Sequence, residues 1–94
     1  MKAEKLKDLV ITALEDMKGK DITCLDISKI TTITDFMIVA TGTSSRHVKS
    51  LTEEVGQKSK EAGCSVYGME GQGQAEWILV DLGDVVVHVM QEES

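Results

Sequence analysis

The segment from residue 76 to residue 90 constrains the fold more than any other part of the chain. It consists of two runs rich in valine, leucine and isoleucine, separated by the short turn Leu82-Gly83-Asp84. Apolar runs of this length around a glycine-containing turn predict two strands, at 76–82 and 85–90, that pair as an antiparallel hairpin. The chain must therefore build a β-sheet that includes this hairpin.

The first strand of this hairpin has two different faces, because successive side chains of a strand point in opposite directions. One face carries only apolar residues: Ile78, Val80 and Leu82. The other carries Trp77, Leu79 and Asp81. A face with a carboxylate is the less suitable one for a core, so we expect Trp77 and Leu79 to form an exposed apolar patch, which is typical of an interaction site. Alternatively, a C-terminal segment or the loop at 68–74 covers Trp77.

Two helices are predicted from apolar residues spaced three and four apart. The first spans about 2–18, with Gly19 as its C-terminal cap; its apolar residues are Leu6, Leu9, Val10, Ala13, Leu14 and Met17. The second follows the turn Gly42-Thr43-Ser44-Ser45, with Thr43 or Ser44 as its N-cap, and ends at Gly63.

Three further strands complete the prediction. The first is a short strand around 22–27. The second is the apolar run 36–41, which is expected to be covered on both faces, and the third is at Val66 and Tyr67, before a flexible loop at 68–74. The order α-β-β-α-β-β-β predicts one α/β (mixed α+β) domain over residues 1–94, with a five-stranded mixed sheet and helices packed on it.

Length and composition place the chain among small globular proteins. With 94 residues it is expected to form one domain. No secretory signal or membrane-spanning stretch is present, and Cys24 and Cys64, each in a different predicted strand, lack CxxC spacing. We therefore expect reduced cysteines, no membrane association and a cytoplasmic location.

The charge distribution is uneven. All ten Lys and Arg residues lie before residue 64, whereas the remainder has only acids: Glu70, Glu76, Asp81, Asp84, Glu92 and Glu93. Such a surface does not suit the phosphates of DNA, but it suits a basic protein. The alternative is that the acidity serves only solubility.

The turn at 41–47 is the main candidate for binding an anion. Thr43 and Ser44 precede a helix whose first N–H groups are free to bind anions, and Arg46 adds a positive charge. The segment is neither a P-loop nor GxGxxG, so the signal is weak.

Catalysis and metal binding have little support in the sequence. Nucleotidyl transfer needs closely spaced carboxylates for metal ions, but Asp81 and Asp84 are three residues apart and no DxD motif occurs. Cysteines and histidines (Cys24, Cys64, His47 and His88) lack standard zinc-ligand spacing. We expect no enzyme activity, no cofactor and no metal.

Several motifs together resemble the ribosomal silencing factor (Iojap, RsfS) family over essentially the whole chain. The matching residues are Asp21-Ile22, 25–28, Ile33-Thr34-Asp35, 40–48, Glu70-Gly71 and 76–90. The resemblance implies a nucleotidyltransferase-like topology without the transferase carboxylates. It also implies binding to ribosomal protein number fourteen of the large subunit, which blocks subunit joining and lowers translation when nutrients are limiting.

Because Trp is the residue that most often carries interface energy, we expect the outer face of the last hairpin to be the partner-binding site. Trp77 would lie at its centre, Leu79 beside it, and Asp81 and Glu76 at the rim. The family usually has an aromatic C-terminal tail beyond residues 91–94, which we expect to be absent. Two other hypotheses are a nucleotide-handling enzyme that uses the turn Gly42–His47 and a structural module that forms a homodimer.

Overall fold

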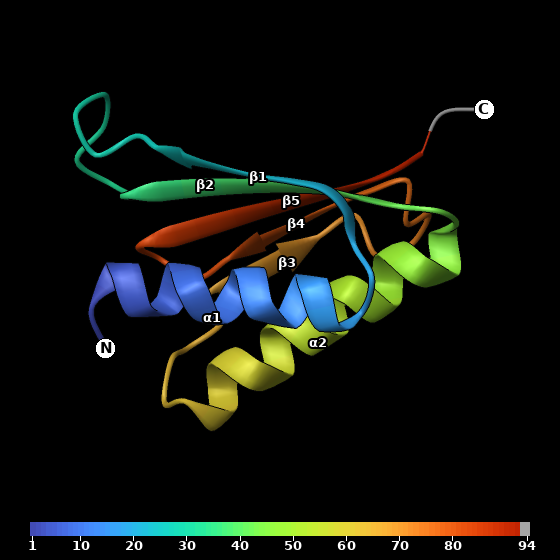
Figure 1. The fold of residues 1–94 in the computed structure, drawn as a ribbon, viewed down its shortest axis with the longest axis horizontal. Coiled ribbons are helices and arrows are strands. Elements are labelled where there is room, and N and C mark those ends of the chain that lie inside the picture. Colours follow the sequence, from blue (N-terminus) through green and yellow to red (C-terminus); the bar gives the residue numbers. More distant parts are fainter. Residues whose placement is uncertain (93–94) are drawn as a thin grey trace.

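The computed structural model describes residues 1–92 and contains seven elements in the predicted order. They are α1 (Ala3–Asp16), β1 (Lys20–Asp26), β2 (Phe36–Gly42), α2 (Ser45–Glu61), β3 (Gly68–Glu70), β4 (Trp77–Asp81) and β5 (Val85–Gln91). The strands form one five-stranded sheet in the order β1-β2-β5-β4-β3. Figure 1 shows both helices beneath this sheet. The predicted class, a single domain with a mixed sheet and packed helices, is confirmed.

The centre of the sheet is a parallel pair, in which β2 runs beside β5 from Phe36↔Val85 to Gly42↔Gln91. All the other pairs are antiparallel. Parallel neighbours need a long crossover connection. Here the chain leaves β2, passes through α2, forms β3 and β4, and returns as β5.

The hydrophobic core lies between the sheet and the two helices. It takes alternate residues from the central strands and one stripe from each helix; the largest fully buried members include Leu14, Ile38, Leu51, Ile78, Val80 and Val87. The predicted inward face of the hairpin (Ile78, Val80 and Leu82) is confirmed. Burial of these side chains provides the main drive for folding.

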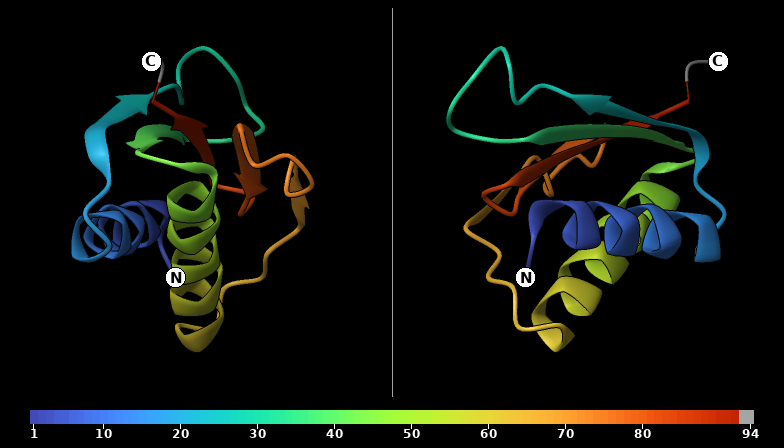
Figure 2. Two further views of the ribbon diagram at one scale, coloured as in Figure 1. Left: turned by 90° about the vertical axis from the view of Figure 1, so that its right-hand side faces the viewer. Right: turned by 60° about the vertical axis from the view of Figure 1, so that its left-hand side comes forward.

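Only one face of the sheet is covered by helices, as Figure 2 shows from two further directions. The expectation that the strand at 36–41 is covered on both faces is therefore wrong. Ile38 and Ala40 are fully buried, whereas Met37 and Val39 point to the other face and are only half-buried. The apolar run did not reveal this, because its outward residues are as hydrophobic as its inward ones.

Each helix is followed by a residue in the left-handed conformation, but the residue type differs between the two helices. After α2, Gly63 takes a left-handed conformation with φ of +85°, as predicted for a C-terminal cap. After α1, Lys18 takes this conformation with φ of 60°, so the assignment of Gly19 is wrong by one residue. A Cβ atom on Gly19 would lie 3.1 Å from the Leu14 carbonyl oxygen, so glycine serves close packing at this position.

The third strand is also displaced from its prediction. It spans Gly68–Glu70, within the predicted loop, and Met69 pairs with Val80 and packs against the core. Val66 and Tyr67 lie in the preceding connection, although the Tyr67 N–H donates to the Asp81 carbonyl oxygen at 2.8 Å. Cys64 lies in this connection and not in a strand. The three glycines at 68–73 wrongly indicated a loop for the whole segment.

We predict that Gly42→Ala lowers the free energy of unfolding by about 1–3 kcal/mol, the usual cost of overpacking. A Cβ atom there would lie 2.8 Å from Val48 Cγ2 and 3.0 Å from the Val48 nitrogen. Gly68→Ala is the matched control, because nothing lies within 4 Å of its added Cβ. Urea unfolding measures both variants; equal midpoints would contradict the close-packing role of Gly42.

Candidate functional site

The outer surface of β4 and β5, opposite the helices, contains three of the predicted partner-binding residues. We call it the outer hairpin face and define it by six residues: Trp77, Leu79, Asp81, Val86, His88 and Met90. The strand register pairs Trp77 with Met90, Leu79 with His88 and Asp81 with Val86. The structure thus brings together three of the four predicted partner-binding residues, and Glu76 directly precedes Trp77.

Trp77 is the most exposed residue of this face, with 57% of its surface accessible to solvent. Its indole is nevertheless held in place, because Nε1 donates a hydrogen bond to Nδ1 of His88 at 3.0 Å. The two rings are tilted by 55°, with centroids 5.7 Å apart. Trp77 therefore presents a large apolar surface in a defined orientation.

His88 belongs to this face but was not among the predicted partner-binding residues. The alternation in the second hairpin strand was a usable signal, since Val85, Val87 and Val89 are buried and the residues between them point outward. Partial burial lowers the pKa of His88 below its ordinary value of 6.5. The imidazole is consequently neutral near pH 7.

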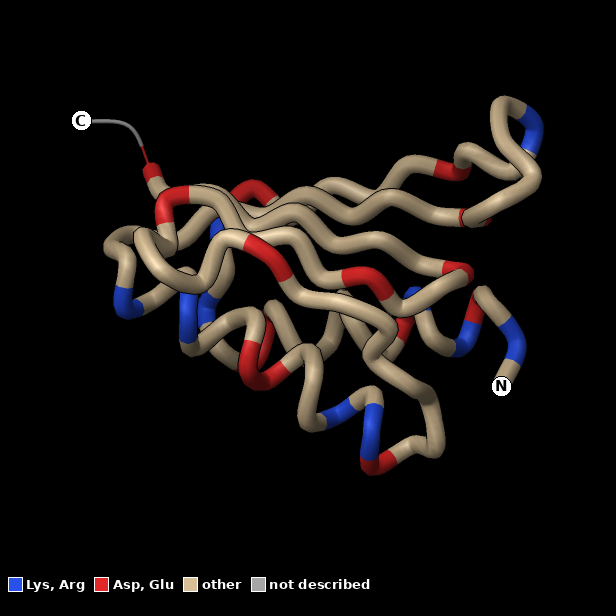
Figure 3. The backbone as a smooth tube through the Cα atoms, turned by 180° about the vertical axis from the view of Figure 1, so that it is seen from behind, with Lys and Arg blue, Asp and Glu red and all other residues tan. Residues whose placement is uncertain are grey.

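The carboxylates of the face lie around its apolar centre. Asp81 is half-buried, and its Oδ1 accepts a hydrogen bond from the Gly83 N–H at 2.9 Å, which braces the hairpin turn. Glu76 is exposed, and Glu70 lies opposite Leu79 on β3. Figure 3 shows acidic positions along these strands, and no Lys or Arg occurs in β2, β3, β4 or β5.

The loop between β3 and β4 supports the backbone of Trp77 and leaves its ring open. A Cβ atom on Gly71 would lie 2.1 Å from the Trp77 carbonyl oxygen, so only glycine fits there. Ala75, fully buried with φ of 57°, anchors the end of the loop. The alternative that this loop covers Trp77 is not supported, because the residue stays more than half exposed. Glu93 and Ser94 lie outside the described residues.

At the predicted anion site (Thr43, Ser44 and Arg46), hydrogen bonds through His47 connect the start of α2 to the end of α1. The Thr43 N–H donates to His47 Nδ1 at 2.9 Å, and Ser44 Oγ accepts from the His47 N–H as the N-cap. His47 Nε2 lies 2.8 Å from the Met17 carbonyl oxygen at the end of α1. Two of the N–H groups that an anion would use are therefore already paired, and anion binding stays a prediction.

The remaining nucleophiles and potential metal ligands are dispersed. Cys24 is on β1, Cys64 Sγ lies 3.8 Å from Met1 Sδ, and the two histidines have the separate partners described above. Within residues 1–92, no three His, Cys, Asp or Glu side chains gather as a metal site. In the same range, neither helix is long and apolar enough to cross a membrane.

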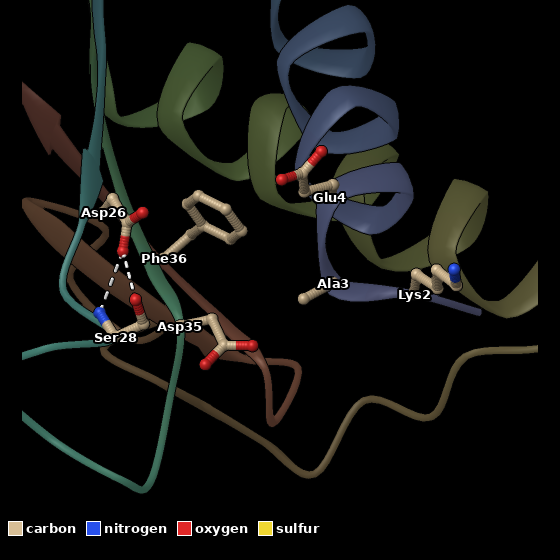
Figure 4. A pocket seen from close by; sticks show the side chains of 7 residues that line it. All are labelled: Lys2, Ala3, Glu4, Asp26, Ser28, Asp35 and Phe36. Atoms are coloured by element: carbon tan, nitrogen blue, oxygen red, sulfur yellow. Dashed lines mark hydrogen bonds between the residues drawn. The ribbon is translucent and has the colours of Figure 1, made fainter.

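A hollow of about 440 Å³ opens between the start of α1 and the β1–β2 connection (Figure 4). Glu4, Asp26 and Asp35 line it together with Lys2 and Phe36. Asp26 accepts hydrogen bonds from the Ser28 hydroxyl at 2.6 Å and the Ser28 N–H at 3.0 Å, which lower the pKa of its carboxyl group. This carboxylate braces its own connection, so the outer hairpin face remains the stronger candidate.

We predict that Trp77→Ala leaves the thermal midpoint nearly unchanged, because the indole is mainly exposed. Leu14→Ala is the control; it removes a fully buried side chain and is expected to cost about 2–5 kcal/mol. Calorimetry measures the thermal midpoints of both variants and shows whether Trp77 contributes to the core. A similar fall in both midpoints would show that Trp77 is part of the core.

Comparisons with known proteins agree with this fold. A family model described as "Ribosomal silencing factor during starvation" matches residues 1–94. A ribosomal silencing factor RsfS from Chromobacterium violaceum is 56% identical over 90 residues, which cover 96% of this chain and 74% of that protein. A crystal structure of a protein from the same organism has a TM-score of 0.94 at 55% identity, and the match covers 97% of this chain and 76% of that one.

A more distant relative comes from Mus musculus and is named mitochondrial assembly of ribosomal large subunit protein 1. It is 26% identical over 90 residues, which are 93% of this chain and 40% of that protein. The family model covers every residue of the chain, and the bacterial relative and the crystal structure extend over nearly all of it. The chain therefore belongs to the family of ribosomal silencing factors, RsfS.

Proposed function

We propose that this chain binds the large ribosomal subunit through a basic ribosomal protein, number fourteen of that subunit, and blocks joining of the small subunit. Translation would thereby fall when nutrients are limiting. Membership of the silencing-factor family supports the role, and the name of the mouse relative associates that protein with the large subunit. The observation that carries the proposal is the exposed, hydrogen-bonded Trp77 on the outer hairpin face, whose six residues include no Lys or Arg.

The composition of the outer hairpin face fits a protein partner. Protein interfaces combine an apolar centre, often with Trp, and a polar rim. Here Trp77 and Leu79 supply the centre, and Asp81 and Glu76 supply a negative rim. A basic partner would meet this rim with Lys or Arg, which accelerates encounter and fixes orientation.

Steric exclusion is the mechanism that this geometry supports. The molecule measures 35 × 28 × 22 Å along its principal axes. A body of this thickness, docked on a surface that normally contacts another subunit, keeps the two surfaces apart. This mechanism requires no catalytic group, no cofactor and no metal.

We predict that the chain sediments with large ribosomal subunits and not with small ones. Trp77→Ala should weaken this binding by about 2 kcal/mol or more, the usual hot-spot threshold, or about 30-fold in Kd. Gln57→Ala is a matched control, because Gln57 is an exposed side chain on α2, in the helical layer. Gradient sedimentation with purified subunits measures both variants. Absence of the wild-type chain from the large-subunit fraction at low salt would contradict the proposal.

We predict a smaller effect from neutralising the rim. Asp81→Asn and Glu76→Gln should each weaken binding by less than Trp77→Ala and flatten its dependence on salt, because exposed charge pairs mainly tune the association rate. Asn at position 81 keeps an oxygen that can accept from the Gly83 N–H, so the turn is preserved. Association rates between low and physiological salt test this. An unchanged salt dependence in both variants would show that these acids do not face the partner.

A further inference from the structure

The hydrogen bond between Trp77 and His88 fixes the protonation state of the histidine ring. The indole Nε1–H can only donate, so His88 Nδ1, 3.0 Å away, must be an unprotonated acceptor. The proton of the neutral ring is then on Nε2. Nε2 has no hydrogen-bond partner among residues 1–92. In that range every buried side-chain nitrogen or oxygen has a partner, so Nε2 is not a buried atom. Nε2–H is therefore open to solvent on the outer hairpin face.

The surroundings of His88 are mainly apolar. In register it lies between Val39 on β2 and Leu79 on β4, with Val86 and Met90 as its outward neighbours on β5. On the other neighbouring strand, β2, no residue is charged, whereas the side of β4 and β3 carries two carboxylates: Asp81, two residues along β4 from Leu79, and Glu70 of β3. Neither carboxylate bonds to His88 among the described residues; burial of the ring is what favours its neutral form.

We propose that His88 is a partner-binding and positioning residue of the outer hairpin face. Its Nδ1 holds the Trp77 indole in the orientation that the partner meets, and its Nε2–H donates to an uncharged acceptor, such as a carbonyl oxygen, of that partner. The partner-binding part of this inference rests on the proposed function. The positioning part concerns the free protein and rests on the observed hydrogen bond alone.

This arrangement predicts that partner binding weakens as the pH falls. When His88 takes up a proton, both ring nitrogens become donors, and Nδ1–H then opposes the indole N–H. The indole loses its acceptor, and a positive charge appears on a face meant for a basic partner. Binding should therefore be full above the ordinary histidine range and fall as the pH drops through the lowered pKa of His88.

The first test uses the free protein and exploits the fact that Trp77 is the only tryptophan in the chain. Its single indole N–H resonance should be shifted by the hydrogen bond and should titrate with a midpoint below pH 6.5. In His88→Phe the resonance should move toward that of a solvent-exposed indole and lose the titration. His47, the other histidine, is unchanged in this variant, so a titration that persists would overturn the positioning role.

The second test measures binding to purified large subunits between pH 7.5 and 5.5. His88→Phe should weaken binding about 3- to 10-fold at pH 7.5, the range of one lost hydrogen bond, and should remove most of the pH dependence. His88→Asn, a second variant with an acceptor but no titrating group, should also bind independently of pH. Met90→Leu, on the same face, should keep the wild-type pH profile and thereby controls for effects of acid on the subunits.

The outcomes separate the two ideas. If the wild-type chain binds and His88→Phe binds equally well with the same pH profile, the inference about His88 is wrong and the proposed function stands. If the wild-type chain does not bind at any pH, the proposed function fails together with the partner-binding role. The indole titration then still decides whether His88 positions Trp77.

Discussion

The parallel pairing of β2 with β5 at the centre of the sheet determines where the functional surface lies. To place β5 beside β2 in the same direction, the chain must cross the sheet after β2, and it does so through α2. Both α1 and α2 lie on the same face of the sheet. The opposite face of the described structure is left without helical cover, and its central side chains are half-exposed as a consequence of topology. The candidate binding site is the part of this face that carries a tryptophan.

An open apolar sheet face favours aggregation, because exposed hydrophobic patches promote non-specific association between molecules. Polar groups within and around the outer hairpin face reduce this tendency. Asp81 braces the hairpin turn and adds a negative charge, Glu70 and Glu76 lie at the margin, and the polar edge of the indole is satisfied by His88. The large apolar surface of Trp77 is thus presented without an unpaired donor. A rigid aromatic residue loses little conformational entropy on binding, which is one reason why tryptophan often dominates interface energies.

The strand alternation of β4 was enough to predict which face Trp77, Leu79 and Asp81 share, since a period of two requires only the local pattern. The same argument was available for β5 but was obscured, because four of its first five residues are valine and conceal the alternation. The contact between His88 and Trp77 depends on hairpin register, in which Leu79 is opposite His88. The displaced third strand and the left-handed Lys18 have a related cause. In both cases tertiary packing, of Met69 onto the core and of Gly19 against Leu14, overrides the local preference of glycine for loops and caps.

The uneven distribution of Lys and Arg over the molecule favours one orientation of an approaching basic partner. The Lys and Arg residues lie on the helices, their flanking turns, β1 and the β1–β2 connection, whereas β2, β3, β4 and β5 carry none. A basic protein that approaches from the helical side meets cations and carboxylates together, whereas one that approaches the face formed by β4 and β5 meets carboxylates without cations. Because long-range electrostatics act before contact, this asymmetry would favour encounters in which the outer hairpin face leads. The apolar contact at Trp77 would then set the lifetime of the complex, so charge and burial would control different stages of the same binding event.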